Sequence, residues 1–236
     1  MSETAKFALP LVQPAQAQKH VTVNEALVRL DGMTQLTLAS ATEGTPPVAA
    51  EDGDSYAVPL GAVNAWEGHA GEVAVWSNGG WVFVTPAIGW RAWIADAGEA
   101  ALFDGVSWIA GGLAVSANRA VSAFQVLEFD HVLAAGASSS TTVEIPQYAM
   151  VFAVTGRIKT ALTGTLTSWD FGVSGSTNRY GSGLGLAQGS WISGMGGQPT
   201  TYWSDTPLEL TANGGDFAGG EVRLAIHYYS ATPPVV

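Results

Sequence analysis

The segment Trp76-Ser77-Asn78-Gly79-Gly80-Trp81 decides the fold of the first half of the chain. Asn-Gly is a strong signal for a two-residue type I′ hairpin turn, because both central residues of that turn adopt positive φ. With Asn78-Gly79 in the turn, Trp76 lies opposite Trp81 on the same sheet face. Cross-strand aromatic pairs contribute roughly 0.2–1 kcal/mol each. The segment therefore predicts a short hairpin that is closed by two tryptophans.

A second segment, Phe103-Asp104-Gly105-Val106-Ser107-Trp108, repeats the pattern. A type II′ turn at Gly105-Val106 would place Phe103 opposite Trp108. Two copies make only a weak internal repeat, because solenoids need about three. We expect a Trp-rich β-hairpin module whose small core is formed by Trp66, Trp76, Trp81, Trp90, Trp93 and Trp108.

Composition favours a β-rich binding or structural protein over a helical enzyme. The chain has 236 residues, enough for one large or two ordinary domains. Charged residues make up 12%, against roughly 25% in typical soluble domains. Hydrophobic residues make up 47%, which excludes disorder as the main state.

Charge and cysteine content exclude several classes of function. The net charge is −11 and the nine basic residues are scattered, which argues against nucleic-acid binding because phosphate neutralisation needs clustered Lys and Arg. The chain has no cysteine, so it has neither disulfides nor thiolate metal sites. Residues 1–6 lack the pattern of a signal peptide, and no stretch approaches the roughly 20 apolar residues of a membrane helix. We therefore expect synthesis and folding in the cytoplasm, with no membrane insertion.

The first 48 residues are predicted to form an extended arm and one helix. Residues 7–12 have an extended pattern, and Thr22 with Glu25 forms a capping box for a helix over residues 23–35. One amphipathic helix cannot bury its own apolar face. We therefore expect this segment to serve attachment and oligomerisation through Val23, Ala26, Leu27 and Leu30.

The second half of the chain predicts an antiparallel β-sandwich or jelly roll. Short strand patterns alternate with turn signals from residue 124 to residue 236. In the last strand, Val222, Leu224 and Ile226 should face one way while Arg223 and His227 face the other. The small, polar stretch 111–122 is the best linker candidate. The fold class is thus mainly β, with an N-terminal arm and helix at 1–48, the hairpin module at 49–112, a linker at 113–123 and the sandwich at 124–236.

No catalytic residue, metal site or cofactor is expected. The histidines are isolated in sequence, and Glu51, Asp52 and Asp54 lack the spaced ligand series of a calcium loop. The Gly-rich stretch 181–185 lacks the context of a phosphate cradle, so we expect a flexible loop there. Asp170 and Asp205 are the one imaginable glycosidase pair, and a lone pair of aspartates is usually structural. The sequence predicts a non-enzymatic protein.

Aromatic residues of the second half suggest where a ligand could bind. Exposed rings near Gly-rich loops suit stacking on sugar rings, with polar side chains bonding the hydroxyls. The candidates are Trp169, Asn178, Tyr180, Trp191, Tyr202 and Trp203. The alternative is that these aromatics fill the sandwich core or a subunit interface. In an acidic protein, recognition by stacking and hydrogen bonds would depend weakly on salt.

Residues 8–27, from Ala8-Leu9-Pro10-Leu11 to Asn24-Glu25-Ala26-Leu27, resemble the start of a family of alphaproteobacterial phage and prophage proteins of unknown function. Further motifs of the family follow in the same order along this chain, at residues 52–56, at 89–93 and at Phe103-Asp104-Gly105 with Trp108. The resemblance therefore covers roughly residues 8–108. Some members are similar to the head-spike proteins of gene transfer agents, which are implicated in adhesion to capsular polysaccharide. The part from residue 124 resembles the C-terminal module of such members, most clearly at 210–215.

The resemblance implies a spike or fibre protein of a phage-like particle, a phage or a gene transfer agent, that adheres to the polysaccharide of the host-cell surface. One alternative is a purely structural scaffold or connector, and another is a capsule depolymerase. The implied partners are other copies of the chain, with a trimer favoured and a pentamer possible, and other capsid, spike or tail proteins. The implied location is a virion that is assembled in the bacterial cytoplasm and released by lysis.

Overall fold

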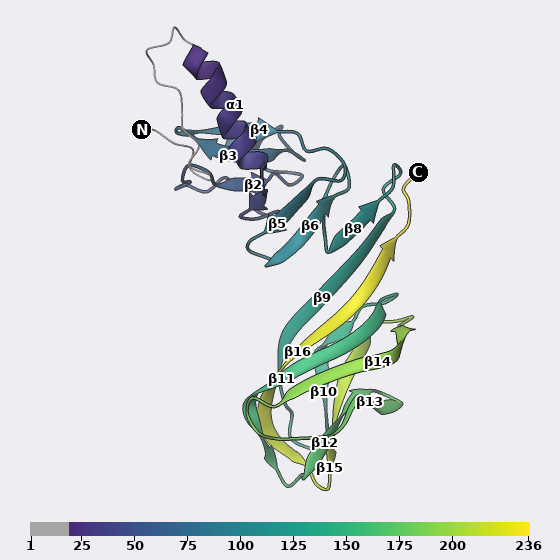
Figure 1. Cartoon of the computed structure of the whole chain (residues 1–236). Coiled ribbons are helices and arrows are strands. Elements are labelled where there is room, and N and C mark those ends of the chain that lie inside the picture. Colours follow the sequence, from purple (N-terminus) through teal and green to yellow (C-terminus); the bar gives the residue numbers. More distant parts are fainter. Residues whose placement is uncertain (1–18) are drawn as a thin grey trace. The chain divides into compact units, whose positions relative to one another are not determined.

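The computed structural model describes residues 19–236 and confirms a mainly β protein. The chain divides into two compact units (Figure 1). Unit 1 extends to Val121 and includes Pro233–Val236, and unit 2 is Ser122–Thr232. The stretch 113–123, for which the sequence predicts a linker, contains the end of strand β8 (Gly112–Val115), a turn and the first residues of β9 (Val121–Val132).

Unit 1 begins, in its described part, with the helix α1 (Lys19–Met33). The predicted capping box is wrong, because Thr22 lies inside the helix and the helix ends at Met33 rather than at residue 35. A Cβ atom on Gly32 would lie 3.0 Å from the side chain of Val75, so the end of α1 packs closely on strand β3. The predicted extended arm at residues 7–12 lies outside the described residues.

The strands of unit 1 form two small sheets. One has the order β2-β3-β4 and the other the order β1-β5-β6-β7. The elements are β1 (Thr37–Leu38), β2 (Ser55–Ala57), the short 3-10 helix η1 (Asn64–Trp66), β3 (Val73–Ser77), β4 (Gly80–Val84), β5 (Arg91–Ile94), β6 (Glu99–Phe103) and β7 (Trp108–Ala110).

The first predicted hairpin is confirmed in its register. Trp76 lies opposite Trp81, and their rings meet edge to face with centroids 5.0 Å apart. Asn78 and Gly79 have φ values of 51° and 82°, as a type I′ turn requires. The expectation that all six tryptophans form the core is wrong for Trp93, which is 48% exposed. Side chains along β5 alternate between exposed and buried positions, and the two neighbours of Trp93 are the ones that point into the core.

The second hairpin is confirmed as well, with Phe103 opposite Trp108. Its turn is organised by Asp104, whose Oδ1 accepts hydrogen bonds from the backbone N–H groups of Val106 and Ser107. Arg119 donates two hydrogen bonds to Oδ2 of the same carboxylate, at 3.1 and 2.8 Å. This partly buried ion pair ties the predicted linker stretch to the hairpin turn.

Unit 2 is a sandwich of two sheets. One has the order β10-β15-β12-β13, and in the other β14, β11, β16 and β9 are neighbours in that order (Figure 1). The strands are β10 (Ser138–Ile145), β11 (Met150–Gly164), β12 (Ser168–Val173), β13 (Ser176–Leu184), β14 (Trp191–Thr201), β15 (Thr206–Asn213) and β16 (Phe217–Thr232). One hydrophobic cluster from both sheets forms the core.

Strand alternation decides which side chains of unit 2 are buried. On β16, Leu224 and Ile226 are fully buried while Arg223 is exposed, as predicted. The prediction of a flexible loop at residues 181–185 is wrong, because β13 extends to Leu184. Asp170 on β12 holds this stretch by accepting hydrogen bonds from the N–H of Gly183 and the hydroxyl of Ser182.

Candidate functional site

Three of the predicted ligand-binding residues lie in the core of unit 2. Trp169 has no exposed surface, and its Nε1–H donates to the carbonyl of Gly185. Tyr180 and Tyr202 are almost fully buried and share a hydrogen bond of 2.7 Å between their hydroxyls. Burial, followed by the bond to Tyr202, raises the pKa of Tyr180 well above its usual range. These rings have no free face, so they are core residues rather than stacking surfaces.

The other three candidates are exposed but do not form one site. Trp191 is 68% exposed and Trp203 is 74% exposed. Trp191, at the start of β14, lies opposite Arg157 of β11, whereas the other end of β14 lies opposite Met150. Seven residues of β11 separate Arg157 from Met150, so the two ends of β14 are roughly 20 Å apart. Trp203 follows that far end and contacts Tyr148 edge to face, with ring centroids 6.2 Å apart. Asn178 is exposed on β13. Sequence reasoning thus grouped residues that the fold separates.

A groove of about 450 Å³ lies on the outer face of the sheet that contains β14, β11 and β16. On β11, Val154 and Ile158 are buried in the core, so Thr155 and Arg157 point outward by alternation. Arg157 pairs with Trp191 on one side and with Arg223 on the other. An indole and two guanidinium groups therefore stand in a row across three neighbouring strands.

Hydroxyl groups complete the floor of the groove. Ser193 on β14 and Thr155 on β11 are cross-strand partners and both line it. The hydroxyl of Thr155 is 2.9 Å from Nε2 of His227. Glu128 of β9 closes the groove on the side away from Trp191. The groove thus offers one apolar ring face together with neutral and charged hydrogen-bonding groups.

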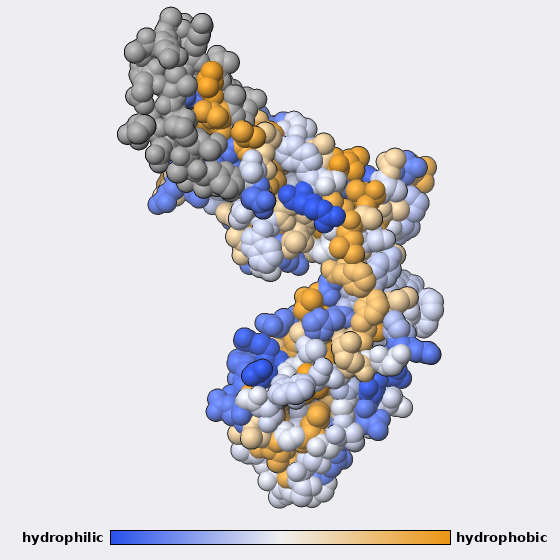
Figure 2. All heavy atoms as spheres, in the orientation of Figure 1, coloured by the Kyte–Doolittle hydropathy of each residue, from blue (hydrophilic) through white to orange (hydrophobic). Residues whose placement is uncertain are grey.

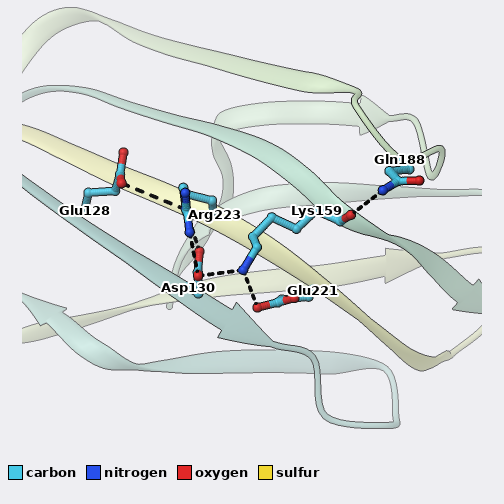
Figure 3. Close-up of polar contacts among 6 residues, drawn as sticks. All are labelled: Glu128, Asp130, Lys159, Gln188, Glu221 and Arg223. Carbon is cyan, nitrogen blue, oxygen red and sulfur yellow. Dashed lines mark hydrogen bonds and ion pairs between the residues drawn. The ribbon is translucent and has the colours of Figure 1, made fainter.

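An ion network borders the groove (Figure 3). Arg223 donates two hydrogen bonds to Asp130, at 2.7 and 2.8 Å, and lies 3.9 Å from Glu128. Lys159 donates to Asp130 and to Glu221. The hydrogen bonds from Arg223 and then Lys159 hold the pKa of Asp130 far below its usual range. The same bonds raise the pKa of Lys159 and of Arg223. Both cations are therefore neutralised within the sheet.

Arg157 differs from the other cations of unit 2. Arg179 donates to the hydroxyl of Thr200, and Lys159 and Arg223 belong to the ion network. The side chain of Arg157 is exposed, and within residues 19–236 it forms neither an ion pair nor a hydrogen bond. Sequence reasoning missed Arg157, because its neighbours on β14 and β16 are 34 and 66 residues away along the chain. No local pattern marks such a residue.

The imagined glycosidase pair does not form a catalytic site. Asp170 opposes Thr211 on β15, whereas Asp205 immediately precedes that strand. Six residues of strand separate the two positions by roughly 20 Å, and glycosidase carboxylates lie about 5–10 Å apart. Hydrogen bonds from the N–H of Gly183 and from Asn213 hold the pKa of Asp170 below its ordinary value. Asp205 accepts a backbone hydrogen bond from Gln147. Both aspartates have structural roles.

The acidic and histidine side chains of the described residues do not converge on a metal site. Across residues 19–236, no group of three His, Asp or Glu side chains is placed to hold a metal ion. Asp54 instead accepts a hydrogen bond from the backbone N–H of Glu51 in its own turn, and Asp52 accepts one from the backbone N–H of Asn78 in the turn between β3 and β4. His69 contacts Glu72 at 2.7 Å, and His131 is buried against Ser139. In the same part of the chain, no helix has the length and apolar character to cross a membrane.

The predicted assembly residues lie on α1. Val23 is 43% exposed and Leu30 is 51% exposed, while Leu27 is half-buried. The side chain of Ala26 lies outside the described part of the structure. Hydrophobic residues are visible at the surface along the described part of the helix (Figure 2). Val23 and Leu30 of this helix therefore present apolar side chains to solvent.

A larger cavity, of about 690 Å³, lies in unit 1. Its lining is mainly aliphatic and backbone, with Val58, Pro59 and Leu60 among its residues. Of its aromatic residues, Phe103 is buried and Trp108 is half-buried. The cavity lacks an exposed ring and an unpaired charge, so the groove of unit 2 is the better-equipped site despite its smaller volume.

The first half of the chain matches a known protein family. Residues 23–109 match the family described as "Protein of unknown function (DUF2793)", which covers α1 from Val23 through most of β7 and leaves unit 2 outside the match. No curated protein matches the chain. A solved structure described as the cyanophage Pam1 capsid asymmetric unit has 24% sequence identity and a TM-score of 0.32. The alignment covers 50% of this chain and 86% of that chain.

Proposed function

We propose that the chain is a non-enzymatic spike or fibre protein of a phage-like particle, and that unit 2 binds polysaccharide on the surface of the host cell. The observation that carries the binding role is the exposed indole of Trp191 in a groove lined by hydroxyl groups. Sugar rings present apolar C–H faces that stack on an indole, while their hydroxyls exchange hydrogen bonds with polar side chains. The volume of the groove, about 450 Å³, lies within the usual range of ligand sites.

Two observations support the proposal that the chain is part of a phage-like particle. Residues 8–108 resemble phage and prophage proteins, and α1 has exposed apolar residues that suit contact with another protein. More specifically, we propose that the particle is a gene transfer agent and that the chain is its head spike. In this proposal, unit 1 attaches the chain to other copies and to other particle proteins, and unit 2 faces the cell. Several copies on one particle would raise the overall avidity, so that each groove binds weakly.

A scaffold without glycan binding is the second candidate. It is favoured by apolar side chains on the same sheet face, where Phe124 is 49% exposed, Val126 60% and Met195 69%. Phe124 contacts Phe152 and Tyr229, with ring centroids 5.3 and 5.6 Å apart. Such a patch suits an interface between subunits. In a scaffold this interface would extend over Trp191 and leave no open groove.

A glycan array probed with the full chain separates these candidates. The adhesin role predicts binding that is lost in Trp191→Ala and kept in Trp203→Ala, a matched change of an exposed tryptophan outside the groove. Absence of binding to every glycan, together with loss of self-association in Trp191→Ala, would favour the scaffold. Release of reducing ends from capsule by the purified chain would contradict the non-enzymatic role.

A further inference from the structure

The geometry points to an acidic sugar, one that carries a carboxylate, as the ligand of the groove, with Arg157 as the residue that binds the carboxylate. This inference rests on the proposed polysaccharide binding and assigns its ligand class. It depends on the contrast between one unpaired guanidinium and a surrounding set of cations that are already paired.

The charges around the groove leave one position for an anion. Arg223 and Lys159 are bound by Asp130, Glu221 and Glu128, so a ligand anion would have to displace a protein carboxylate to reach them. Arg157 has its five N–H donors free of protein acceptors in the described structure. A guanidinium binds a carboxylate through two parallel hydrogen bonds. The site is therefore built for one planar anionic group per ligand.

The position of Arg157 fits a sugar that stacks on Trp191. The two residues are direct partners across β11 and β14, and side chains opposed in this way have Cβ atoms about 4.5–5.5 Å apart. A pyranose ring on the indole would hold a ring substituent within reach of the guanidinium. Ser193 and Thr155 are cross-strand partners two residues away on the same two strands. There they can form hydrogen bonds with the remaining hydroxyls of the sugar.

The acidic neighbours limit how much charge the ligand can carry. Glu128 lies on β9, two strands from β11, or roughly 10 Å away, and the chain as a whole has a net charge of −11. A densely anionic polymer would be repelled by this field. One carboxylate per repeating unit gains the bond to Arg157 and avoids most of that repulsion.

The test compares two forms of one probe: surface polysaccharide purified from the bacterium that encodes the chain, in native form and after carbodiimide–borohydride reduction of its carboxylates to alcohols. Affinity of the full chain is measured by biolayer interferometry. We expect about fivefold weaker binding of the reduced form, because the reduced sugar loses its paired, charge-assisted hydrogen bonds to Arg157, which solvent screening keeps modest at an exposed site. Arg157→Ala should bind both forms equally weakly, and Arg157→Lys should bind the native form with intermediate affinity, because it keeps the charge without the paired donors. Arg179→Ala, which removes the same charge outside the groove, should bind like the parent.

The outcomes distinguish this inference from the proposed function. Equal binding of both forms by the parent chain would overturn the carboxylate and keep the polysaccharide role. Equal losses in Arg157→Ala and Arg179→Ala would show a diffuse charge effect and would also overturn it, as would stronger binding to dextran sulfate than to the native probe. Failure of the parent to bind any of these polymers would overturn the proposed function itself.

Discussion

Trp191 and Arg157 are direct cross-strand partners, and the side chains of both are open to solvent. The pair places an apolar ring face beside a charged, planar donor on the rigid scaffold of a sheet. Ring stacking supplies contact area at little cost in side-chain entropy, and the guanidinium supplies discrimination between neutral and acidic sugars. A groove with this pair differs from a purely electrostatic site in how it responds to salt.

Salt should weaken polysaccharide binding only slightly. One exposed ion pair is worth about 0–1 kcal/mol, so raising NaCl from 50 to 500 mM should lower the affinity by less than about fivefold. The measurement is an interferometry titration of native surface polysaccharide at both salt concentrations. A loss of a hundredfold or more would mean that charge, rather than stacking on Trp191, provides the affinity.

Replacement of Trp169 should affect stability rather than recognition alone. The side chain is fully buried and donates a hydrogen bond of 2.9 Å to Gly185. Trp169→Ala should therefore lower the free energy of unfolding by about 3–5 kcal/mol. Trp203→Ala, at an exposed tryptophan, should change it by less than about 0.5 kcal/mol. Urea unfolding followed by circular dichroism measures both values, and equal effects would contradict the assignment of Trp169 to the core.

The ion pair between Asp104 and Arg119 should make unit 1 sensitive to acid. Burial alone would raise the pKa of Asp104, but hydrogen bonds from Ser107, Arg119 and Val106 lower it below the ordinary value. Because the folded-state pKa lies below the unfolded one, the stabilisation is present above about pH 4 and is lost as the pH falls further. Asp104→Ala should lower stability at pH 7 by about 1–3 kcal/mol.

The control for this prediction is Asp96→Ala, which removes an exposed carboxylate with no hydrogen bond of its own in the described structure. Thermal unfolding at pH 7 and pH 3 should show a difference between the parent and Asp104→Ala that shrinks at pH 3. A difference that stays constant, or that Asp96→Ala reproduces, would show that the ion pair does not cause the acid sensitivity.

The apolar surface of α1 should be needed for assembly and dispensable for folding. Leu30 is 51% exposed, so Leu30→Asp should change the free energy of unfolding by less than about 0.5 kcal/mol. A charge at an interface is costly to bury, so the variant should fail to enter particles when it is expressed in place of the parent. Immunoblots of purified particles measure incorporation. Normal incorporation of a folded Leu30→Asp variant would show that this face of α1 has no partner.

Local sequence patterns predicted the parts of the fold that local physics determines. The Asn78-Gly79 turn set the pairing of Trp76 with Trp81, because its geometry leaves only one register. Strand alternation likewise predicted which side of β16 faces the core. The helix boundary failed because Thr22 forms part of a longer helix. The end of strand β13 was missed because residues 181–183 are small and polar, whereas the hydrogen bond that holds Gly183 is accepted by Asp170, 13 residues away in the sequence.

The candidate site was predicted only in part, because burial of an aromatic ring depends on contacts far away in the sequence. Trp169 and Trp191 have similar local surroundings, and yet the first is in the core and the second is open. Arg157 gains its role from pairing with two strands that come later in the chain. Pattern reasoning finds aromatic candidates, and tertiary structure decides which of them a ligand can reach.

The central claim is that the groove at Trp191 attaches the protein to cells. The most direct measurement is flow cytometry of fluorescently labelled full chain on encapsulated cells of the encoding bacterium and on an acapsular mutant of the same strain. We predict that the parent and Trp203→Ala label encapsulated cells equally, that Trp191→Ala labels them at the background level, and that none labels acapsular cells. Undiminished labelling by a folded Trp191→Ala variant, or equal labelling of acapsular cells by the parent, would contradict the account.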